Sequence, residues 1–377
     1  MELTLEELEA LEPGSYTLLD LRSEQETAYG TIPGSVPANA AALPEGLPAE
    51  PGRIVLFCTR GKLSLETAER LRDEGFDACS LKGGYLAWLM RQMQRQEAEE
   101  LCSRVENSLR KRFRLKLWCN FTKAIRQYEL VKPNDRIAVC MSGGKDSMLM
   151  AKLFQELKRH NKFPFEVVYL VMDPGYNAAN RKIIEENARM LGIPATIFET
   201  QIFDAVYNID KSPCYLCARM RRGYLYRRAM DLGCNKIALG HHYDDVIETN
   251  LMGMLYGAQI QTMMPKLHSI HFDRMEVIRP MYLIREADII HWRDYNDLHF
   301  IQCACRFTDT CTTCRPDGTS VSKRMEVKKM IAEMKKTNPY VEGNIFRSME
   351  NVNLDTVIGY KQHGVRHSFL EGYNEIR

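Results

Sequence analysis

A run of small and charged residues in the middle of the chain has the composition of a phosphate-binding turn. The sequence Ser142-Gly-Gly-Lys-Asp-Ser147 follows the β-branched run 136–141 and precedes a helical pattern at 148–157. It therefore predicts a strand, a tight turn and the start of a helix. Unpaired N–H groups at such a start favour an anion, which the two glycines would let approach closely and the lysine would attract. The alternative is a glycine turn that only joins a strand to a helix.

A cysteine near the N-terminus lies where a thiol would be reactive. Cys58 follows the buried strand pattern 53–57, and the loop 59–64 leads into a helical pattern. N–H donors between a strand and a helix lower the pKa of a cysteine. Cys58 is therefore a candidate nucleophile, for which Arg60 and Lys62 would supply positive potential.

Further cysteines occur in close pairs. Cys214 and Cys217 have a spacing that lets two thiolates bind one metal centre. Two later pairs are Cys303 with Cys305 and Cys311 with Cys314. In a reducing compartment the 12 cysteines point to metal or sulfur chemistry rather than to disulfides. The single cysteines with apolar neighbours are predicted to be small buried residues: Cys79, Cys102, Cys119, Cys140 and Cys234.

Polar residues also follow two other predicted strands. Asp173 ends the strand pattern 165–172, and Gly240-His-His-Tyr-Asp-Asp245 ends the strand 236–240. Strands that alternate with helices predict a parallel sheet with ligands at the carboxyl ends of its strands, so these residues and the serine-glycine turn would share one edge. The carboxylates could hold Mg²⁺ on a phosphate. Capping of the next helix is the alternative role.

Length and composition indicate a globular protein of two or three domains. The 377 residues exceed one ordinary core, and Lys plus Arg exceed Asp plus Glu by only 51 − 49 = 2, so net charge does not decide for nucleic acid. We expect a small α/β domain at 1–90, a helical connector and basic helix at 91–130, a parallel α/β domain at 131–350 and a tail at 351–377. No apolar run could span a bilayer and the first residues lack a signal-peptide pattern, so we expect a cytoplasmic protein without a membrane partner.

Two basic clusters are candidates for RNA contact. One is the run 109–118, which is equally consistent with the solvated face of an amphipathic helix. The other follows Cys217, and its density suits an RNA backbone; it comprises Arg219, Arg221, Arg222, Arg227 and Arg228.

The N-terminal segment resembles the rhodanese-like domains. The resemblance is carried by Asp20-Leu-Arg22, Ile32-Pro-Gly34, the Cys58 loop and Leu81-Lys-Gly-Gly-Tyr-Leu-Ala-Trp88, and in that family the loop cysteine carries a persulfide sulfur. Thr31 replaces a common histidine, and the loop lacks an arginine that is usual after its glycine. An active sulfur carrier and a docking domain without activity are the two interpretations.

Residues from about 105 to 348 resemble the tRNA 2-thiocytidine synthetases of the PP-loop ATP pyrophosphatase superfamily. The shared motifs are Ser-Gly-Gly-Lys-Asp-Ser, the Cys214 segment, Leu239-Gly-His-His-Tyr-Asp-Asp245 and Arg279-Pro-Met-Tyr-Leu-Ile-Arg-Glu286. The resemblance implies an adenine-nucleotide α-hydrolase-like fold, ATP with Mg²⁺, and a [4Fe-4S] cluster. Its expected nucleotide-binding residues are Ser142, Gly143, Gly144, Lys145, Asp146, Ser147, Asp173, Gly240, His241, Asp244 and Asp245.

The same resemblance assigns the cluster ligands. Cys214 and Cys217 would be joined by Cys303, for which Cys305 is a competitor. Three protein ligands leave one iron open to sulfide. Zinc bound by Cys214, Cys217 and two of the four later cysteines is the alternative, and Cys311 and Cys314 have no counterpart in the family pattern.

Together these features predict an ATP-dependent tRNA sulfurtransferase. It would adenylate a base carbonyl, cytidine C2, and replace the oxygen with sulfur, with Cys58, Lys145, Cys214, Cys217 and Cys303 as the catalytic residues. Its partners would be tRNA and a protein or small-molecule sulfur donor; a homodimer fits the sequence, which does not fix the oligomeric state. Thiolation of another tRNA base or of a small molecule is one alternative, and a non-catalytic nucleotide- and metal-binding adaptor is another.

Overall fold

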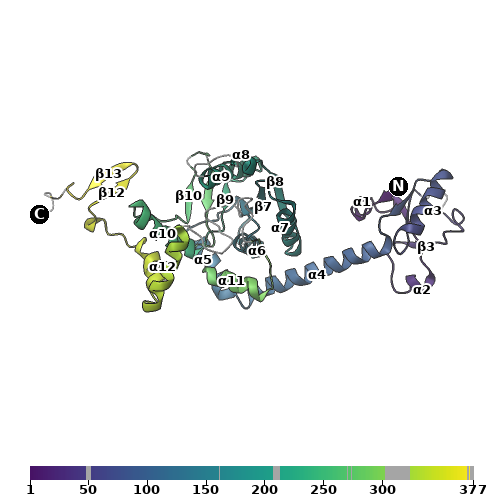
Figure 1. Ribbon diagram of the computed structural model, residues 1–377, viewed down its shortest axis with the longest axis horizontal. Coiled ribbons are helices and arrows are strands. Elements are labelled where there is room, and N and C mark those ends of the chain that lie inside the picture. Colours follow the sequence, from purple (N-terminus) through teal and green to yellow (C-terminus); the bar gives the residue numbers. More distant parts are fainter. Residues whose placement is uncertain are drawn as a thin grey trace. The chain divides into compact units, whose positions relative to one another are not determined.

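Separate hydrophobic cores divide the chain into two units, Met1–Glu100 and Leu101–Arg377. They are seen in a computed structural model, which describes residues 1–47, 52–160, 162–206, 213–269, 271–272, 274–301, 323–371 and 373. Each unit has its own α/β sheet, and Figure 1 labels the elements. The predicted fold class is thus confirmed, whereas the finer domain boundaries remain predictions.

The first unit is a five-stranded parallel sheet in the order β1-β5-β4-β2-β3. Its strands are β1 (Glu2–Leu3), β2 (Tyr16–Asp20), β3 (Val36–Pro37), β4 (Arg53–Phe57) and β5 (Ala78–Leu81), and its helices are α1 (Leu5–Ala10), α2 (Glu24–Thr27) and α3 (Lys62–Asp73). Along β4, Ile54 and Leu56 pack into one core while Val55 and Phe57 pack into a second. Because both faces are covered, β4 is apolar at consecutive positions. Cys58 follows directly at its carboxyl end.

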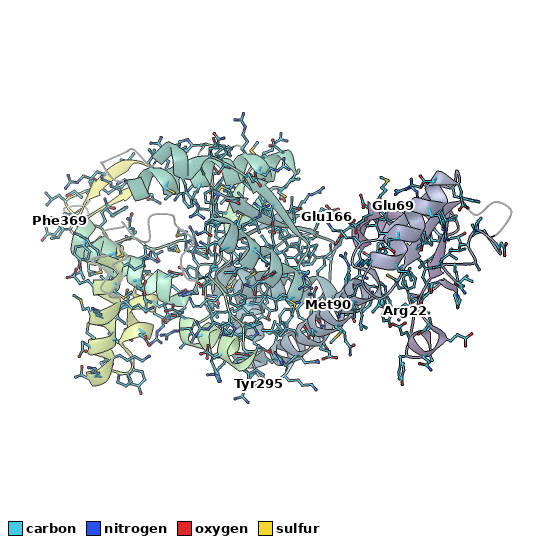
Figure 2. The ribbon with its side chains drawn as sticks, turned by 45° about the vertical axis from the view of Figure 1, so that its right-hand side comes forward. Arg22, Glu69, Met90, Glu166, Tyr295 and Phe369 are labelled. Atoms are coloured by element: carbon cyan, nitrogen blue, oxygen red, sulfur yellow. The ribbon has the colours of Figure 1, made fainter. Side chains whose placement is uncertain are left out.

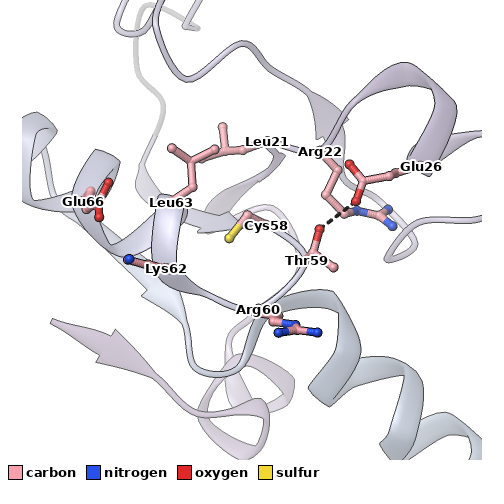
Figure 3. A pocket seen from close by; sticks show the side chains of 9 residues that line it. All are labelled: Leu21, Arg22, Glu26, Cys58, Thr59, Arg60, Lys62, Leu63 and Glu66. Carbon is pink, nitrogen blue, oxygen red and sulfur yellow. Dashed lines mark hydrogen bonds between the residues drawn. The ribbon is translucent and has the colours of Figure 1, made fainter.

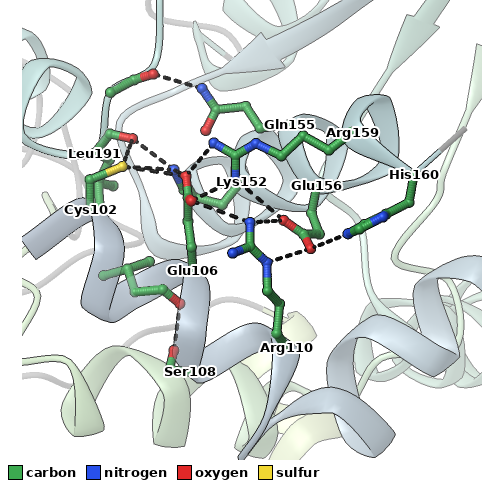
Figure 4. Close-up of polar contacts among 12 residues, drawn as sticks. Cys102, Glu106, Ser108, Arg110, Lys152, Gln155, Glu156, Arg159, His160 and Leu191 are labelled. Atoms are coloured by element: carbon green, nitrogen blue, oxygen red, sulfur yellow. Dashed lines mark hydrogen bonds and ion pairs between the residues drawn. The ribbon is translucent and has the colours of Figure 1, made fainter. Parts of the chain in front are cut away.

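Helix α4 (Gly84–Arg110) begins in the first unit and ends in the second. The Gln- and Glu-rich stretch predicted as a helical connector is therefore helical, and side chains such as Met90 are exposed along it (Figure 2). Its last turns are held to helix α6 (Lys145–Arg159) by ion pairs of 2.9 Å between Glu106 and Lys152 and 2.7 Å between Arg110 and Glu156 (Figure 4). A buried charge needs such a partner.

The prediction that the five single cysteines are buried holds for Cys79 and Cys234, whereas Cys102, Cys119 and Cys140 are half-buried. Cys102 shows the clearest departure. Its Sγ lies 3.3 Å from the buried Lys152 Nζ and 3.3 Å from the carbonyl oxygen of Leu191 (Figure 4), and its side chain is only half-buried. The prediction of an apolar environment was wrong because the neighbours along the chain do not report the lysine that α6 brings from a distant position.

The second unit contains a six-stranded sheet in the order β10-β11-β9-β6-β7-β8, in which only the β10–β11 pair is antiparallel. The strands are β6 (Arg136–Met141), β7 (Glu166–Asp173), β8 (Ala195–Glu199), β9 (Lys236–Ala238), β10 (Lys266–His268) and β11 (Glu276–Ile278). The main core contacts one face and includes residues of α5 (Cys119–Gln127), α6 and α7 (Ala178–Met190). Helix α9 (Pro213–Asp231) packs Tyr226 and Ala229 against the other face. The carboxyl ends of β6, β7 and β9 therefore carry the predicted site residues.

The remaining elements complete the second unit. They are the π-helical turn η1 (Arg114–Trp118), helices α8 (Ile202–Val206), α10 (Tyr243–Gly257), α11 (Glu286–Tyr295), α12 (Lys323–Thr337) and α13 (Val341–Ser348), the 3-10 turn η2 (Leu354–Thr356), and the hairpin β12 (Gly359–Gln362) with β13 (Val365–Ser368). The basic run 109–118 is amphipathic as predicted, with Leu117 buried and Lys116 paired at 2.9 Å with Asp288, but the π-helical turn within it was not foreseen. None of the described helices has the length and apolar character required to cross a bilayer.

Candidate functional site

The turn 142–147 joins β6 to α6 as predicted. Gly143 has φ +84°, and a Cβ there would lie 2.6 Å from Ile184 Cγ1. The Ser147 hydroxyl accepts a hydrogen bond from the Ser142 backbone N–H (3.1 Å) and donates one to the Gly144 carbonyl (2.9 Å). Gly144 is the N-cap of α6 and has no side-chain cap, so the first N–H groups of the helix are not used by a cap side chain. This geometry is that of an anion-binding helix start.

The charged residues of the turn form a small network. Lys145 Nζ lies 3.1 Å from Asp146 Oδ2 and 3.2 Å from Glu286 Oε1 at the start of α11. Burial would raise the pKa of Glu286, but Lys328 and Lys145 outweigh it and lower the pKa to about 2. Lys145 is thus paired with two carboxylates, and an incoming phosphate can replace them as its anionic partner. Asp146 Oδ1 is buried without a hydrogen-bond partner among the described residues.

The segment 240–245 lies against this turn. A Cβ on Gly240 would be 3.4 Å from the backbone N of Ser147, so the exit of β9 contacts the first turn of α6. His242 is the N-cap of α10, and Asp245 accepts its backbone N–H at 3.0 Å. Capping and proximity to the glycine turn are therefore both realised by one segment, and the two predicted roles are not exclusive.

The two carboxylates expected to hold Mg²⁺ are paired with arginines. Asp244 Oδ1 lies 3.0 Å from Arg285 Nη2, and Asp245 Oδ1 lies 2.6 Å from Arg324 Nη1. Within the described ranges, no three His, Cys, Asp or Glu side chains form a group that could hold a metal ion. The carboxylate oxygen of Asp146 is the acidic atom near the turn without such a partner.

Asp173 is buried at the end of β7. Its Oδ1 accepts backbone N–H groups of Gly175 (2.8 Å) and Tyr176 (2.7 Å), and its Oδ2 lies 2.6 Å from Arg181. Burial would raise the pKa of Asp173, but these contacts lower it. Asp173 therefore shapes the loop after β7 at the predicted edge of the sheet.

Two titratable groups in the same segment have displaced pKa values. Burial, followed by the charge of Arg279, lowers the pKa of His241 to about 4, so its ring is neutral at pH 7. Burial raises the pKa of Glu248, which lies in the second turn of α10, to about 7. Displaced values of this kind gather at functional sites. The sequence reasoning passed over Glu248 because its spacing matches an ordinary helix position.

Helix α9 carries the cysteine pair and the arginine cluster. Cys217 lies in the first turns, is half-buried and packs against the main core of the second unit. Cys214 is on the same helix, three residues earlier, where the two residues share a face; its side chain is outside the described part. Of the arginines, Arg219, Arg222 and Arg227 are exposed and Arg221 lies 3.4 Å from the Tyr176 hydroxyl.

The other predicted ligands cannot be placed. Cys303, Cys305, Cys311 and Cys314 all lie outside the described residues. The set of ligands and the competing zinc arrangement therefore stay predictions.

The first unit holds a pocket of about 470 Å³ over Cys58 (Figure 3). The Gly61 N–H donates to the Cys58 sulfur (3.2 Å), and the Ser64 hydroxyl lies 3.5 Å from it. Burial would raise the pKa of Cys58, but the hydrogen bonds from Ser64, Arg60 and Gly61 outweigh it and lower the pKa. Arg60 and Lys62 line the pocket, as the sequence predicted. The geometry is that of a stabilised thiolate.

Arg22 lines this pocket, and Thr31 helps to hold Arg22 in place through Asp20. Arg22 pairs with Asp20 at 2.6 Å and stacks 3.6 Å over the ring of Tyr85. The Thr31 hydroxyl donates to Asp20 Oδ2 at 2.6 Å. Threonine thus supplies a hydrogen bond to the buried ion pair of Asp20 and Arg22.

Comparisons with known proteins agree with this geometry. A family model described as a PP-loop domain matches residues 115–306, and a rhodanese-like domain model matches residues 4–91. A tRNA-cytidine(32) 2-sulfurtransferase of Anaeromyxobacter dehalogenans is 34% identical over 61% of this chain and 77% of its own length. One of Aliivibrio fischeri is 36% identical over 65% of this chain and 76% of its own length. The chain belongs to the PP-loop family of these sulfurtransferases. The resemblance predicted for both parts of the sequence is thereby confirmed.

Two solved structures are each similar to a part of this chain. The U34-tRNA thiolase NcsA from Methanococcus maripaludis with its [4Fe-4S] cluster is 20% identical, has a TM-score of 0.48 and covers 61% of this chain and 76% of that chain. The human single-domain sulfurtransferase TSTD1 is 30% identical, has a TM-score of 0.22 and covers 24% of this chain and 95% of that chain.

Proposed function

We propose that this protein is an ATP-dependent tRNA sulfurtransferase that activates the C2 carbonyl of a cytidine and replaces its oxygen with sulfur. The observation that supports it most is the turn from Ser142 to Ser147 at the start of α6, which contains Lys145 and contacts the exit of β9. Curated relatives that carry the name tRNA-cytidine(32) 2-sulfurtransferase support the choice of base and substrate.

The turn would hold the phosphates of ATP. The carbonyl oxygen of the base attacks the α-phosphate and pyrophosphate leaves, which converts a poor leaving oxygen into an adenylate. Lys145, released from Glu286, would stabilise the charge on the departing pyrophosphate. Asp146 is the residue that fits Mg²⁺, since its buried Oδ1 has no hydrogen-bond partner among the described residues and phosphate oxygens with waters can complete such a site. Sulfide then attacks C2 and AMP departs.

The cysteines of α9 would hold the [4Fe-4S] cluster. Cys214 and Cys217 share a helix face, Cys217 is half-buried, and thiolates are the donors that iron–sulfur clusters take. Cys303 is the proposed third ligand. A cluster with three protein ligands supplies an open iron that can bind sulfide. The chain's own contribution is to place these cysteines on the helix whose exposed arginines can contact tRNA phosphates.

The first unit would deliver the sulfur. The stabilised thiolate of Cys58 fits a persulfide carrier, fed with sulfane sulfur by a protein or small-molecule donor. A thiol reductant would then supply the two electrons that release the outer sulfur as sulfide and regenerate the Cys58 thiolate. We further propose that the protein works in the cytoplasm, where its cysteines stay reduced, and as a homodimer.

The test is turnover by the anaerobically purified protein with tRNA, ATP and sulfide. We expect release of pyrophosphate and AMP together with 2-thiocytidine in the digested RNA. A different thionucleoside would change the base, while no tRNA-dependent pyrophosphate release would favour a non-catalytic adaptor. A Lys145→Met variant should lose at least about 100-fold in rate, the effect expected for removing a charge that stabilises the transition state. The exposed Lys162→Met serves as its control.

A further inference from the structure

Arg279 is a charged residue of the second unit that the proposed mechanism does not use. It directly follows β11, whose Ile278 pairs with Ala238 of β9, so Arg279 leaves the sheet beside Gly240 and His241. On the other side of β9 lies β6, which leads into the phosphate-binding turn. Three adjacent strands therefore end in Arg279, in the histidine segment and in the turn.

The guanidinium of Arg279 has no ionic partner among the described residues. No carboxylate oxygen of the described residues lies within 4.0 Å of a guanidinium nitrogen of Arg279, which is the limit for an ion pair. Its Nε is buried without a hydrogen-bond partner. Nη1 donates to the carbonyl oxygen of Met264, a neutral acceptor. Burial lowers the pKa of Arg279, and the charge of Arg222 acts in the same direction. Arg279 as a whole is half-buried, but its guanidinium stays charged at any physiological pH, and an anion would stabilise the charge next to the buried Nε.

The neighbours of Arg279 do not supply that anion. His241 is neutral at pH 7, because burial and Arg279 itself lower its pKa to about 4. Asp245 is close enough to influence Arg279, but it is paired at 2.6 Å with Arg324. The hydroxyls of Tyr226 and Tyr282 face the same region and are protonated, since burial raises the pKa of both. The ligand must therefore bring the negative charge.

The distance from the turn indicates which anion this is. Neighbouring strands lie about 4.8 Å apart, so the exits of β11 and β6 are separated by roughly 10 Å across β9. A nucleotide whose terminal phosphates lie on the turn, together with an extended arginine side chain, bridges such a span. An arginine also matches the geometry of phosphate oxygens, to which it donates two parallel hydrogen bonds.

We propose that Arg279 forms a second phosphate subsite, which binds the α-phosphate of the nucleotide. It would keep that phosphate bound in the base adenylate after pyrophosphate has left, and in AMP after sulfide has displaced it. The inference rests on the proposed use of ATP but not on the identity of the thiolated base. A phosphodiester of the bound tRNA has the same chemistry and is the other source of such an anion. The α-phosphate is favoured because Arg279 leaves the sheet two strands from the phosphate-binding turn and its charge acts on His241 at the exit of β9.

The experiment compares AMP with adenosine, which lacks the phosphate. Affinities of the full-length holoprotein for AMP, adenosine, pyrophosphate and unmodified tRNA are measured for the wild type, Arg279→Met, Arg279→Lys and the control Arg293→Met. Arg293 is a half-buried arginine paired with its neighbour Asp294. We expect AMP affinity to fall by about 10- to 100-fold in Arg279→Met and less in Arg279→Lys. Adenosine, pyrophosphate and tRNA affinities should stay within about twofold, as should all affinities of the control.

Several outcomes would overturn the inference. Equal losses for adenosine and AMP mean that Arg279 only supports the fold, a result that thermal midpoints of the variants would corroborate. A loss for tRNA with unchanged AMP affinity assigns the residue to the RNA backbone. Wild-type protein that binds AMP no better than adenosine rules out an α-phosphate subsite. None of these measurements needs thiolation, so failure of the proposed function, seen as absent thionucleoside, is distinguished from failure of this subsite.

Discussion

Replacing Gly143 with alanine should destabilise the second unit and weaken nucleotide binding. The residue has φ +84°, a region that costs an L-residue about 1–2 kcal/mol. The new Cβ would lie 2.6 Å from Ile184 Cγ1 and 2.8 Å from Ile301 Cδ1. The terminal methyl of Ile301 can turn away, but Ile184 is fully buried, so overpacking adds about 1–3 kcal/mol. We expect a total of about 2–5 kcal/mol, expressed as lower stability or as a displaced turn.

Urea denaturation followed by tryptophan fluorescence measures this change, since Trp118 and Trp292 both lie in the second unit. The control is Gly257→Ala at the end of α10, where a Cβ meets nothing within 4 Å and the free energy of unfolding should change by less than about 1 kcal/mol. If Ile184 causes the overlap, adding Ile184→Ala should cost less in the Gly143→Ala protein than alone, by about 1–2 kcal/mol. A Gly143→Ala protein with wild-type stability and wild-type pyrophosphate affinity would refute the geometry of the turn.

Three further changes test the other groups of the molecule. Cys58→Ala should slow thiolation with thiosulfate but leave thiolation with free sulfide nearly intact, with the buried Cys79→Ala as control; equal losses with both donors would contradict a relay. Cys214→Ala should abolish both the brown absorbance of the anaerobic protein and thionucleoside formation, and thiolation that persists without the absorbance would exclude the metal centre from the reaction. Burial raises the pKa of Glu248 from its ordinary 4.5 to about 7, so the folded protein binds an extra proton in this window and loses stability as the pH rises through it. Glu248→Gln should lack this loss. The thermal midpoint of the variant minus that of the wild type should therefore be larger at pH 8 than at pH 5, and the same value at both pH values would show that Glu248 titrates normally.

The sequence predicted those site residues whose position follows from the local pattern. Cys58 and Ser142 each follow an apolar run that can only be a strand, and the glycines after them fix the turn. The parallel order of the strands then brings the turn and Gly240 to one edge, as expected from the alternation of strands and helices.

Residues that act through contacts over long sequence distances could not be found in this way. Glu286 contacts Lys145 only because α11 packs against α6, which begins in the turn. Arg324 contacts Asp245 only because α12 packs against α10. Nothing in the spacing of these residues reports the contact. The same reason explains Cys102, whose charged neighbour comes from a helix 50 positions away in the sequence.

Helix α4 has a consequence for how such a protein can evolve. Each unit buries its own apolar residues, and the turns of α4 around Arg91 to Glu100 are mostly exposed and carry no glycine or proline. Recombination within this stretch would interrupt neither core. A sulfur-supplying module could therefore be exchanged for another, or encoded as a separate gene product, while the nucleotide-dependent module keeps its architecture.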